Sequence, residues 1–161
     1  AADSREILPP TIKKTILVKN PSSNLPRNKT LTYQTALVLN NSTSASERFQ
    51  AASKGLENNV LDKEILDVLF NTMQNDPNTN VRMAAFESLS QFANEKRVKN
   101  RFITALQNQK DPDVKVAIID LLTNLRTNSI KAYLEKIANE EDTNPMVTER
   151  AHKGLMKLAS S

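Results

Sequence analysis

Few side chains in this sequence could take part in catalysis. His152 is the only histidine and there is no cysteine, so a thiolate nucleophile and thiolate metal sites are excluded. Acid–base catalysis by His152 would need a second side chain within hydrogen-bonding reach, and the sequence does not specify one. We therefore predict no catalytic residue, no cofactor and no enzymatic activity.

An acidic cluster is formed by Glu140, Glu141 and Asp142. Carboxylate oxygens are the ligands that hard cations prefer, but these three residues are consecutive and lack the alternating spacing of a calcium-binding loop. We interpret the cluster as a solvated loop and predict no metal site.

A cationic cluster opens one predicted helix, where the helix dipole disfavours positive charge. Its members are Lys96, Arg97, Lys99 and Arg101. This placement indicates a contact with an anion, and nucleic acid is one candidate. The net charge of +4 lies elsewhere, however: residues 1–30 contain six basic and two acidic residues, leaving 22 − 6 = 16 basic and 18 − 2 = 16 acidic residues in the remainder. The repeat region is therefore neutral, whereas nucleic-acid-binding modules usually carry a basic excess. Nucleic-acid binding through this cluster and the basic leader is the alternative function.

The elements that would position these side chains recur every 33 residues. Apolar residues with helical spacing occur at Val81, Ala85, Leu89 and Phe92. The pattern returns as Val114, Ile118, Leu122 and Leu125, and then as Val147, Ala151, Leu155 and Leu158. A weaker copy precedes them at Arg48, Ala52, Leu56 and Asn59. A period of this length predicts stacked helical repeats.

We predict an all-α fold, an α-solenoid of about four antiparallel helical hairpins preceded by an extended N-terminal segment. Two glycines and 4% aromatic residues argue against a sheet. The predicted helices span residues 31–39, 61–74, 96–109, 114–126, 129–138 and 145–159, with further helices starting near Ser44 or Ser46 and after the turn at 75–80. Residues 31–161 form the predicted repeat domain.

Residues 1–30 are predicted to be an extended tether or arm. They contain four of the seven prolines, which disfavour helix. Within them, residues 11–19 have strand character and could lie along the array. No uninterrupted apolar run approaches the 18 or more residues of a membrane span.

The turn-and-helix pattern of Asp76-Pro77 with Val81-Arg82, repeated as Asp111-Pro112 with Val114-Lys115, resembles short HEAT repeats. The resemblance implies that the Asp-Pro caps the inner helix and that the basic residue after the valine pairs with an acid of a neighbouring repeat. It also implies a scaffold. A lyase or glycosylase of HEAT-like fold is a further alternative, and would need a pocket with convergent polar groups.

A narrower resemblance rests on residues 44–48, 76–85, 119–122 and 149–155. These are similar to HEAT-repeat ectodomains of bacterial membrane proteins that carry an anti-sigma-type zinc finger. This resemblance implies a location in the periplasm, as the sensory part of a membrane-bound regulator; a cytoplasmic location is the alternative. The chain departs from these proteins in that its sequence contains neither the zinc finger nor a membrane span.

The inner helices supply the predicted partner-binding residues. If Ala85 points into the core, Met83, Glu87 and Ser90 lie on the opposite side of their helix. The 33-residue shift carries this set along a concave face, where solenoids commonly bind extended partners. The predicted binding residues for a protein or peptide are Gln50, Lys54, Glu57, Met83, Glu87, Ser90, Val116, Asp120, Thr123, Glu149, Lys153 and Met156.

Overall fold

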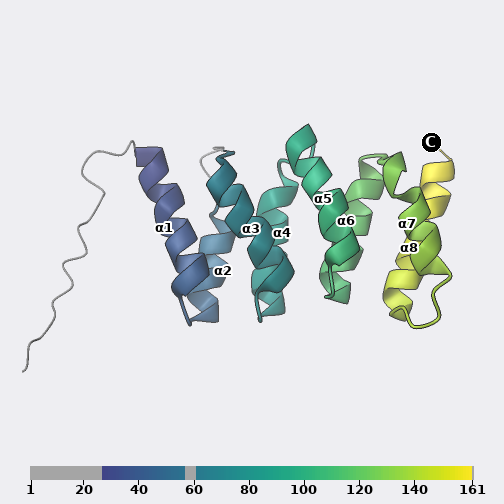
Figure 1. The fold of residues 1–161 in the computed structure, drawn as a ribbon, viewed down its shortest axis with the longest axis horizontal. Helices are drawn as coiled ribbons and strands as arrows, with labels where there is room; N and C mark the ends of the chain where they lie inside the picture. Colours follow the sequence, from purple (N-terminus) through teal and green to yellow (C-terminus); the bar gives the residue numbers. More distant parts are fainter. Residues whose placement is uncertain (1–26, 57–60, 161) are drawn as a thin grey trace, which may run out of the picture.

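A computed structural model describes residues 27–56 and 61–160, and all structural statements below concern these residues. They form eight α-helices, one short 3-10 helix and no strand. The helices, labelled in Figure 1, are α1 (Arg27–Asn41), α2 (Ala45–Ser53), α3 (Lys63–Asn75), α4 (Thr79–Ser90), α5 (Lys96–Asn108), α6 (Pro112–Asn124), η2 (Asn128–Ile130), α7 (Lys131–Ala138) and α8 (Pro145–Ala159).

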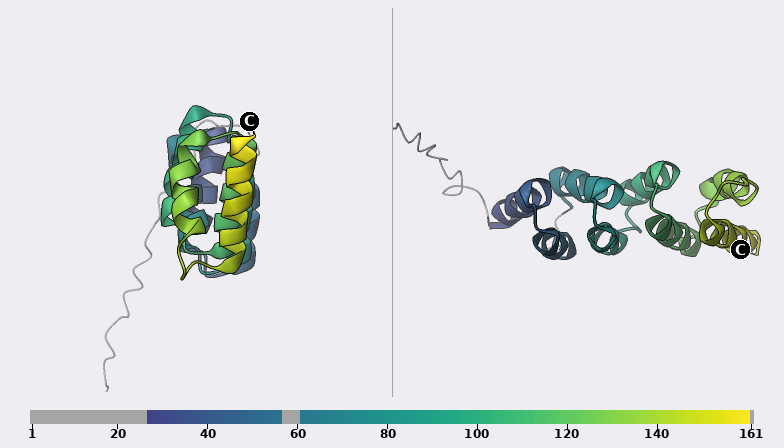
Figure 2. Two further views of the ribbon diagram at one scale, coloured as in Figure 1. Left: turned by 90° about the vertical axis from the view of Figure 1, so that its right-hand side faces the viewer. Right: turned by 90° about the horizontal axis from the view of Figure 1, so that it is seen from below.

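The helices pack as four hairpins in two layers. The odd-numbered helices form one row and the even-numbered helices form the other, as the right-hand view of Figure 2 shows. Each hairpin packs mainly against its sequence neighbours, which is the arrangement of a solenoid. The predicted all-α solenoid of four helical hairpins is confirmed.

Side-chain caps set the starts of the even-numbered helices. The Ser44 hydroxyl accepts a hydrogen bond from the Glu47 amide at 3.3 Å, so α2 begins at the first of the two predicted serines. Asp111 caps α6 by accepting from the amides of Asp113 and Val114 at 2.8 and 3.2 Å. A cap of this kind satisfies amides that have no partner inside the helix.

The cap of α4 differs from the one that the HEAT resemblance implies. Asn78, rather than Asp76, accepts from the first amides of α4. Asp76 instead ends α3, and its carboxylate binds Arg48 and the Asn78 amide. Asp76 lies two positions before the cap residue, with Pro77 between them, so its side chain is available for this other contact.

Several helix boundaries also differ from the predictions: α3, α5 and α6 differ by one or two residues at an end, and the first and seventh helices differ as follows. α1 begins at Arg27, four residues inside the segment predicted to be extended, while residues 1–26 lie outside the described residues. The predicted helix 129–138 is a 3-10 turn followed by the shorter α7. The predicted span of the last helix, 145–159, is confirmed.

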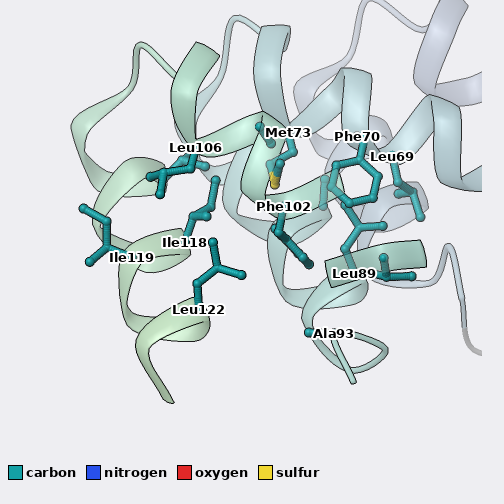
Figure 3. Close-up of a cluster of buried hydrophobic side chains, with 14 of the residues drawn as sticks. Leu69, Phe70, Met73, Leu89, Ala93, Phe102, Leu106, Ile118, Ile119 and Leu122 are labelled. Carbon is teal, nitrogen blue, oxygen red and sulfur yellow. The ribbon is translucent and has the colours of Figure 1, made fainter. Parts of the chain in front are cut away.

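One hydrophobic core runs the length of the array, and Figure 3 shows its central part. At the junction of the second and third hairpins, the ring of Phe102 packs edge-on against Phe70 and Phe86, with centroids 5.1 and 5.8 Å apart. The backbones of α4 and α6 approach each other less closely than those of α2 and α4 or of α6 and α8. The three rings therefore fill space that backbone contact fills at the other junctions.

The end of α6 contains the one non-glycine residue with positive φ among the described residues, Arg126 at 51°. The Thr127 amide donates to the Leu122 carbonyl and the Arg126 amide to the Thr123 carbonyl. These bonds form a Schellman motif, in which the residue after the cap is usually glycine.

Candidate partner-binding face and inter-repeat contacts

We call the solvent side of α2, α4, α6 and α8 the even-helix face; it is defined by the predicted binding residues on these helices. In the first hairpin, Gln50 and Lys54 are exposed, while Glu57 lies outside the described residues. In the second, Glu87 is exposed and Ser90 is half-buried. The four helices lie side by side in one layer (Figure 2), so these positions share one surface.

Thr123 does not belong to this surface. Only 4% of Thr123 is exposed, and its hydroxyl has no hydrogen-bond partner. Gly154 of α8 explains the burial: a Cβ there would lie 3.1 Å from Thr123 Oγ1. Because glycine lacks that atom, α8 approaches α6 closely enough to cover Thr123.

Of the three apolar residues predicted to bind a partner, two are only partly exposed. Met83 and Val116 are half-buried and pack against the core. Met156 of α8 is 66% exposed, the highest value among the large apolar residues of the described chain. The exposed apolar surface of the even-helix face is therefore concentrated at α8.

Two ion pairs involve residues of α8, the helix that carries Met156. Asp120 of α6 pairs with Arg150 of α8, and Glu149 pairs with Lys153 one turn along α8. The Lys153 hydrogen bond lowers the pKa of Glu149, and the hydrogen bond to Asp120 raises the pKa of Arg150. This end of the face thus presents one apolar side chain among ordered charges of both signs.

Two residues of the cationic cluster, Arg97 and Arg101, have a structural role. Arg97 donates to the Leu61 carbonyl at 2.6 Å, and Arg101 pairs with Asp67 at 2.6 Å. The Arg101 guanidinium also lies 4.4 Å from the centroid of the Phe70 ring. A hydrogen bond from Lys63 and the pairing with Arg101 lower the pKa of Asp67. These arginines hold α5 to the preceding hairpin.

The other two cations remain accessible. Lys96 is exposed, Lys99 is half-buried, and neither forms an ion pair with a described residue. Nucleic-acid binding through the cluster would therefore depend on two lysines rather than four cations.

His152 is exposed on α8, beside a shallow depression that Glu140, Glu141 and Thr148 also line. Within residues 27–56 and 61–160, no group of three or more His, Cys, Asp or Glu residues is placed to hold a metal ion. The depression is open to solvent and has no buried titratable group.

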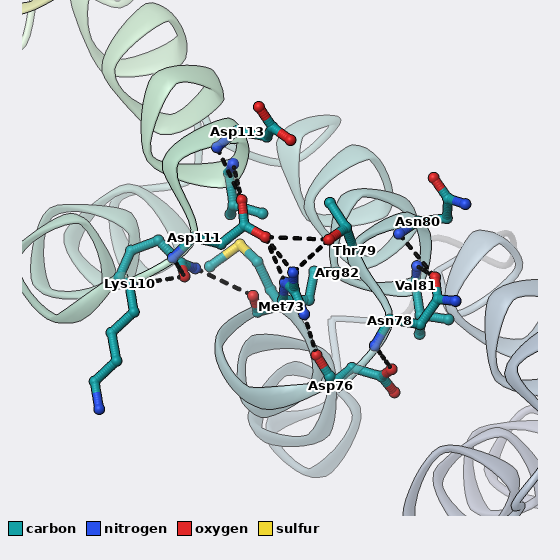
Figure 4. Close-up of polar contacts among 12 residues, drawn as sticks. Met73, Asp76, Asn78, Thr79, Asn80, Val81, Arg82, Lys110, Asp111 and Asp113 are labelled. Atoms are coloured by element: carbon teal, nitrogen blue, oxygen red, sulfur yellow. Dashed lines mark hydrogen bonds and ion pairs between the residues drawn. The ribbon is translucent and has the colours of Figure 1, made fainter. Parts of the chain in front are cut away.

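A ladder of ion pairs joins successive hairpins near the turns within them, and Figure 4 shows the step between Arg82 and Asp111. Arg48 Nε and Nη2 donate to the Asp76 carboxylate at 2.7 and 3.0 Å, and both side chains are buried. Arg82 donates through both Nε and Nη2 to one carboxylate oxygen of Asp111, Oδ2, and also donates to the Asp76 carbonyl. The pairing between basic residue and neighbouring acid that the HEAT resemblance implies is thus present for Arg82.

The ladder shifts the titration of its carboxylates. Burial raises the pKa of both Asp76 and Asp111, but hydrogen bonds from arginine and from backbone amides outweigh it, so each pKa lies below its ordinary value. The hydrogen bond to Asp76 raises the pKa of Arg48. Both carboxylates are therefore charged when the chain is folded at neutral pH.

The third step of the ladder lacks its carboxylate. Lys115 follows Val114 as Arg82 follows Val81, and the residue 29 positions further on is Asn144 where Arg82 has Asp111. Asn144 caps α8 by accepting from the Met146 amide at 2.9 Å. Burial lowers the pKa of Lys115, and only the field of Glu140 opposes this shift.

Glutamine side chains add a second set of contacts that sequence reasoning missed. Gln109 is 2% exposed and donates to the Met73 carbonyl at 3.1 Å, while Gln74 donates to the Ala105 carbonyl at 3.2 Å. Both bonds join α3 to the third hairpin. The sequence signal for the Gln109 contact was the presence of this polar residue directly before the Lys110-Asp111-Pro112 turn.

Comparison with known proteins gives one match. Residues 65–95, which contain most of α3 and all of α4, match the family model of the HEAT repeat. The chain matched no curated protein and no solved structure. None of the described helices has the length and apolar character needed to cross a membrane.

HEAT repeats commonly serve as interaction scaffolds for other proteins and are generally not enzymes. The matched segment is the hairpin from which the 33-residue period was read, and the other three hairpins stack on it in the same two layers. The match therefore identifies one HEAT repeat, in residues 65–95, within an array of four hairpins.

Proposed function

We propose that this chain is a non-enzymatic scaffold that binds a protein or peptide along the even-helix face. The observation that carries the proposal is the arrangement of α2, α4, α6 and α8 as one uncovered row among the described elements. Positions related by the repeat recur across that row, so an extended partner meets similar chemistry at each hairpin.

The exposed side chains favour a partner of mixed character. Met156 supplies a flexible, polarisable contact of the kind found at adaptable binding surfaces. Lys54 and Glu87 lie on the same face of the earlier hairpins, and the Glu149–Lys153 pair lies beside Met156. A segment with an apolar anchor flanked by charges of both signs fits this distribution, because charges set specificity and register.

The test is affinity capture from the cells that contain this protein, followed by mass spectrometry of the captured proteins. Met156→Glu should remove the specific partner, because it places a charge where the partner's apolar side chain docks. Met146→Glu is the matched control: Met146 is also on α8 and is 42% exposed, but it was not among the binding positions. Circular dichroism of both variants verifies that the helices are intact. Equal recovery with both variants would exclude this docking face.

Met83→Glu tests whether the binding surface reaches the second hairpin. Because Met83 packs against the core, its result is interpretable only if the variant melts close to the wild-type temperature. Glu87→Lys, at an exposed position on the same helix, tests the same region without disturbing the core.

A finer proposal concerns location and biological role. On the narrower resemblance described above, the chain is the periplasmic sensory part of a membrane-bound regulator, and partner binding on the even-helix face changes the regulator's output. The test is the location of the native protein by cell fractionation with protease accessibility. Recovery solely from the cytoplasm would reject the periplasmic role and leave the scaffold function standing.

A further inference from the structure

An apolar groove lies on the N-terminal end of the array, between α1 and α2. It has a volume of about 340 Å³ and is lined mainly by carbon atoms of Gln34, Thr35, Val38, Glu47, Gln50, Ala51 and Lys54. No described element covers it. In the second hairpin part of the equivalent surface is buried, although Asn80 and Glu87 remain exposed.

The second hairpin shows what this surface normally contacts. Ala84 lies 33 residues after Ala51 and is 2% exposed, whereas Ala51 is half-buried at the groove. Leu69 of α3 is fully buried, and a Cβ on Gly55 of the first hairpin would lie 3.0 Å from its side chain. A solenoid normally ends in a cap with a polar outer surface, and the α1–α2 groove does not have that character.

The opposite end of the array is polar. The exposed residues of α7 and the following loop include Glu135, Lys136, Asn139 and Glu140, and α8 contributes His152. The C-terminal hairpin therefore carries its own polar outer surface, and the two ends of the array differ.

We propose that residues 11–18 of this chain bind in the α1–α2 groove and cap the first hairpin. The sequence Thr11-Ile12-Lys13-Lys14-Thr15-Ile16-Leu17-Val18 precedes α1. If the backbone is extended, alternate side chains share a side, which would place Ile12, Lys14, Ile16 and Val18 together, three of the four being apolar. Such a segment supplies the apolar side chains that the groove lacks.

The chain is long enough to return to the groove. Val18 and Arg27 are nine positions apart, which spans up to about 30 Å when extended. Val38 lies eleven positions beyond Arg27, about 17 Å along the helix. The segment can therefore run back along α1 and reach the whole groove.

Cross-linking of the full chain tests this docking directly, because the natural sequence has no cysteine. Ile16→Cys is combined with Gln50→Cys, which lines the groove, and the two thiols are joined with a short bismaleimide. The control pairs Ile16→Cys with Phe49→Cys. Phe49 is the adjacent residue, is 44% exposed, and faces the turn at Asn78 and Asn80 instead.

We expect the Gln50 pair to cross-link within one molecule at least about tenfold faster than the Phe49 pair, since docking raises the effective concentration of the thiols. Equal rates would overturn the proposal. Cross-links between molecules at the Gln50 position would also overturn it, by showing that a second copy occupies the groove.

Thermal unfolding supplies a second test. Ile12→Asp, Ile16→Asp and Val18→Asp together should lower the melting temperature of the full chain. The control is the triple change Thr11→Asp, Thr15→Asp and Ser22→Asp, which adds the same charge at residues outside the apolar side. Equal melting temperatures for the two triple variants would count against docking even if the cross-linking rates differed.

Discussion

Arg82 of α4 and Asp111, the cap of α6, form an ion pair that joins the second hairpin to the third. Asp111 therefore performs two tasks, since its other carboxylate oxygen accepts from the amides of Asp113 and Val114. The repeat places a helix cap and an inter-repeat contact at the same residue, so the start of one hairpin is linked directly to the position of the previous one.

Asp111→Asn should separate these two tasks. Asparagine caps helices as well as aspartate does, but it leaves the Arg82 guanidinium, 15% exposed, without its charge partner. We expect a loss of about 3 kcal/mol in the free energy of unfolding, measured by urea denaturation. The control is Asp113→Asn in the exposed first turn of α6, which should cost less than about 1 kcal/mol. Equal losses would mean that the pair contributes little.

Acid should weaken the array through the same carboxylates. Because the folded pKa of Asp76 and of Asp111 lies below the ordinary value, the unfolded chain takes up protons first as pH falls. Stability from these groups is therefore complete above the unfolded pKa of about 3.9 and is lost as pH falls through their folded pKa values. Melting temperatures between pH 2 and 7 test this. The difference in melting temperature between wild type and Asp111→Asn should become smaller towards pH 2. A difference that stays constant would contradict a stabilising role for the ionised Asp111 carboxylate.

Phe102→Ala should be strongly destabilising. Phe102 is fully buried and contacts both Phe70 and Phe86, so truncation leaves a cavity at the junction of the second and third hairpins. We expect a cost of about 3–5 kcal/mol, from chemical denaturation followed by circular dichroism. Phe49→Ala is the control, because Phe49 is 44% exposed and its loss should cost under about 1 kcal/mol.

Arg126→Gly should stabilise the chain. Arg126 is exposed and has φ of 51°, a conformation that costs a non-glycine residue roughly 1–2 kcal/mol. Part of this gain is offset by the greater freedom of glycine in the unfolded chain, so we expect a net gain of about 1 kcal/mol. Arg126→Ala keeps the unfavourable φ and should give no such gain. A rise in melting temperature with alanine would trace the effect to the arginine side chain instead.

Asn144→Asp should restore the third step of the ladder. The new carboxylate would stand where Asp111 stands for Arg82, opposite Lys115, and would keep the cap of α8. We expect a gain of about 1 kcal/mol. Repeating the change in a Lys115→Met background separates the two sources: the cap and dipole part should persist and the ion-pair part should vanish. An unchanged gain in that background would show that no pair forms.

The period and some helix starts were predictable because both depend on local sequence. Apolar spacing located each hairpin, Pro145 marked the start of α8 correctly, and Ser44 was one of the two starts predicted for α2. Thr123 was predicted to be exposed because the prediction used only the rotation of about 100° per residue. That rotation gives the direction of a side chain but not how closely a neighbouring helix approaches it. Its burial depends on Gly154, a residue 31 positions away whose missing side chain lets α8 approach.

The contacts between hairpins were harder to predict for the same reason. The charge of Arg97 and Arg101 was visible in the sequence, but their partners lie more than 30 residues earlier: Leu61 just before α3 and Asp67 within it. Arg48 occupies a position that is apolar in the other repeats, and its ion pair with Asp76 explains why a buried arginine is tolerated there. A single sequence does not give the relative tilt of two helices, which decides such pairings.

The phenyl rings at the centre of the array suggest how it would respond to a pull. Where α2 meets α4 and where α6 meets α8, the backbones come close together, whereas the second and third hairpins meet mainly through side chains, which include the three rings and the Arg82–Asp111 pair. Tension applied at the two ends of the array would load these side-chain contacts at its centre.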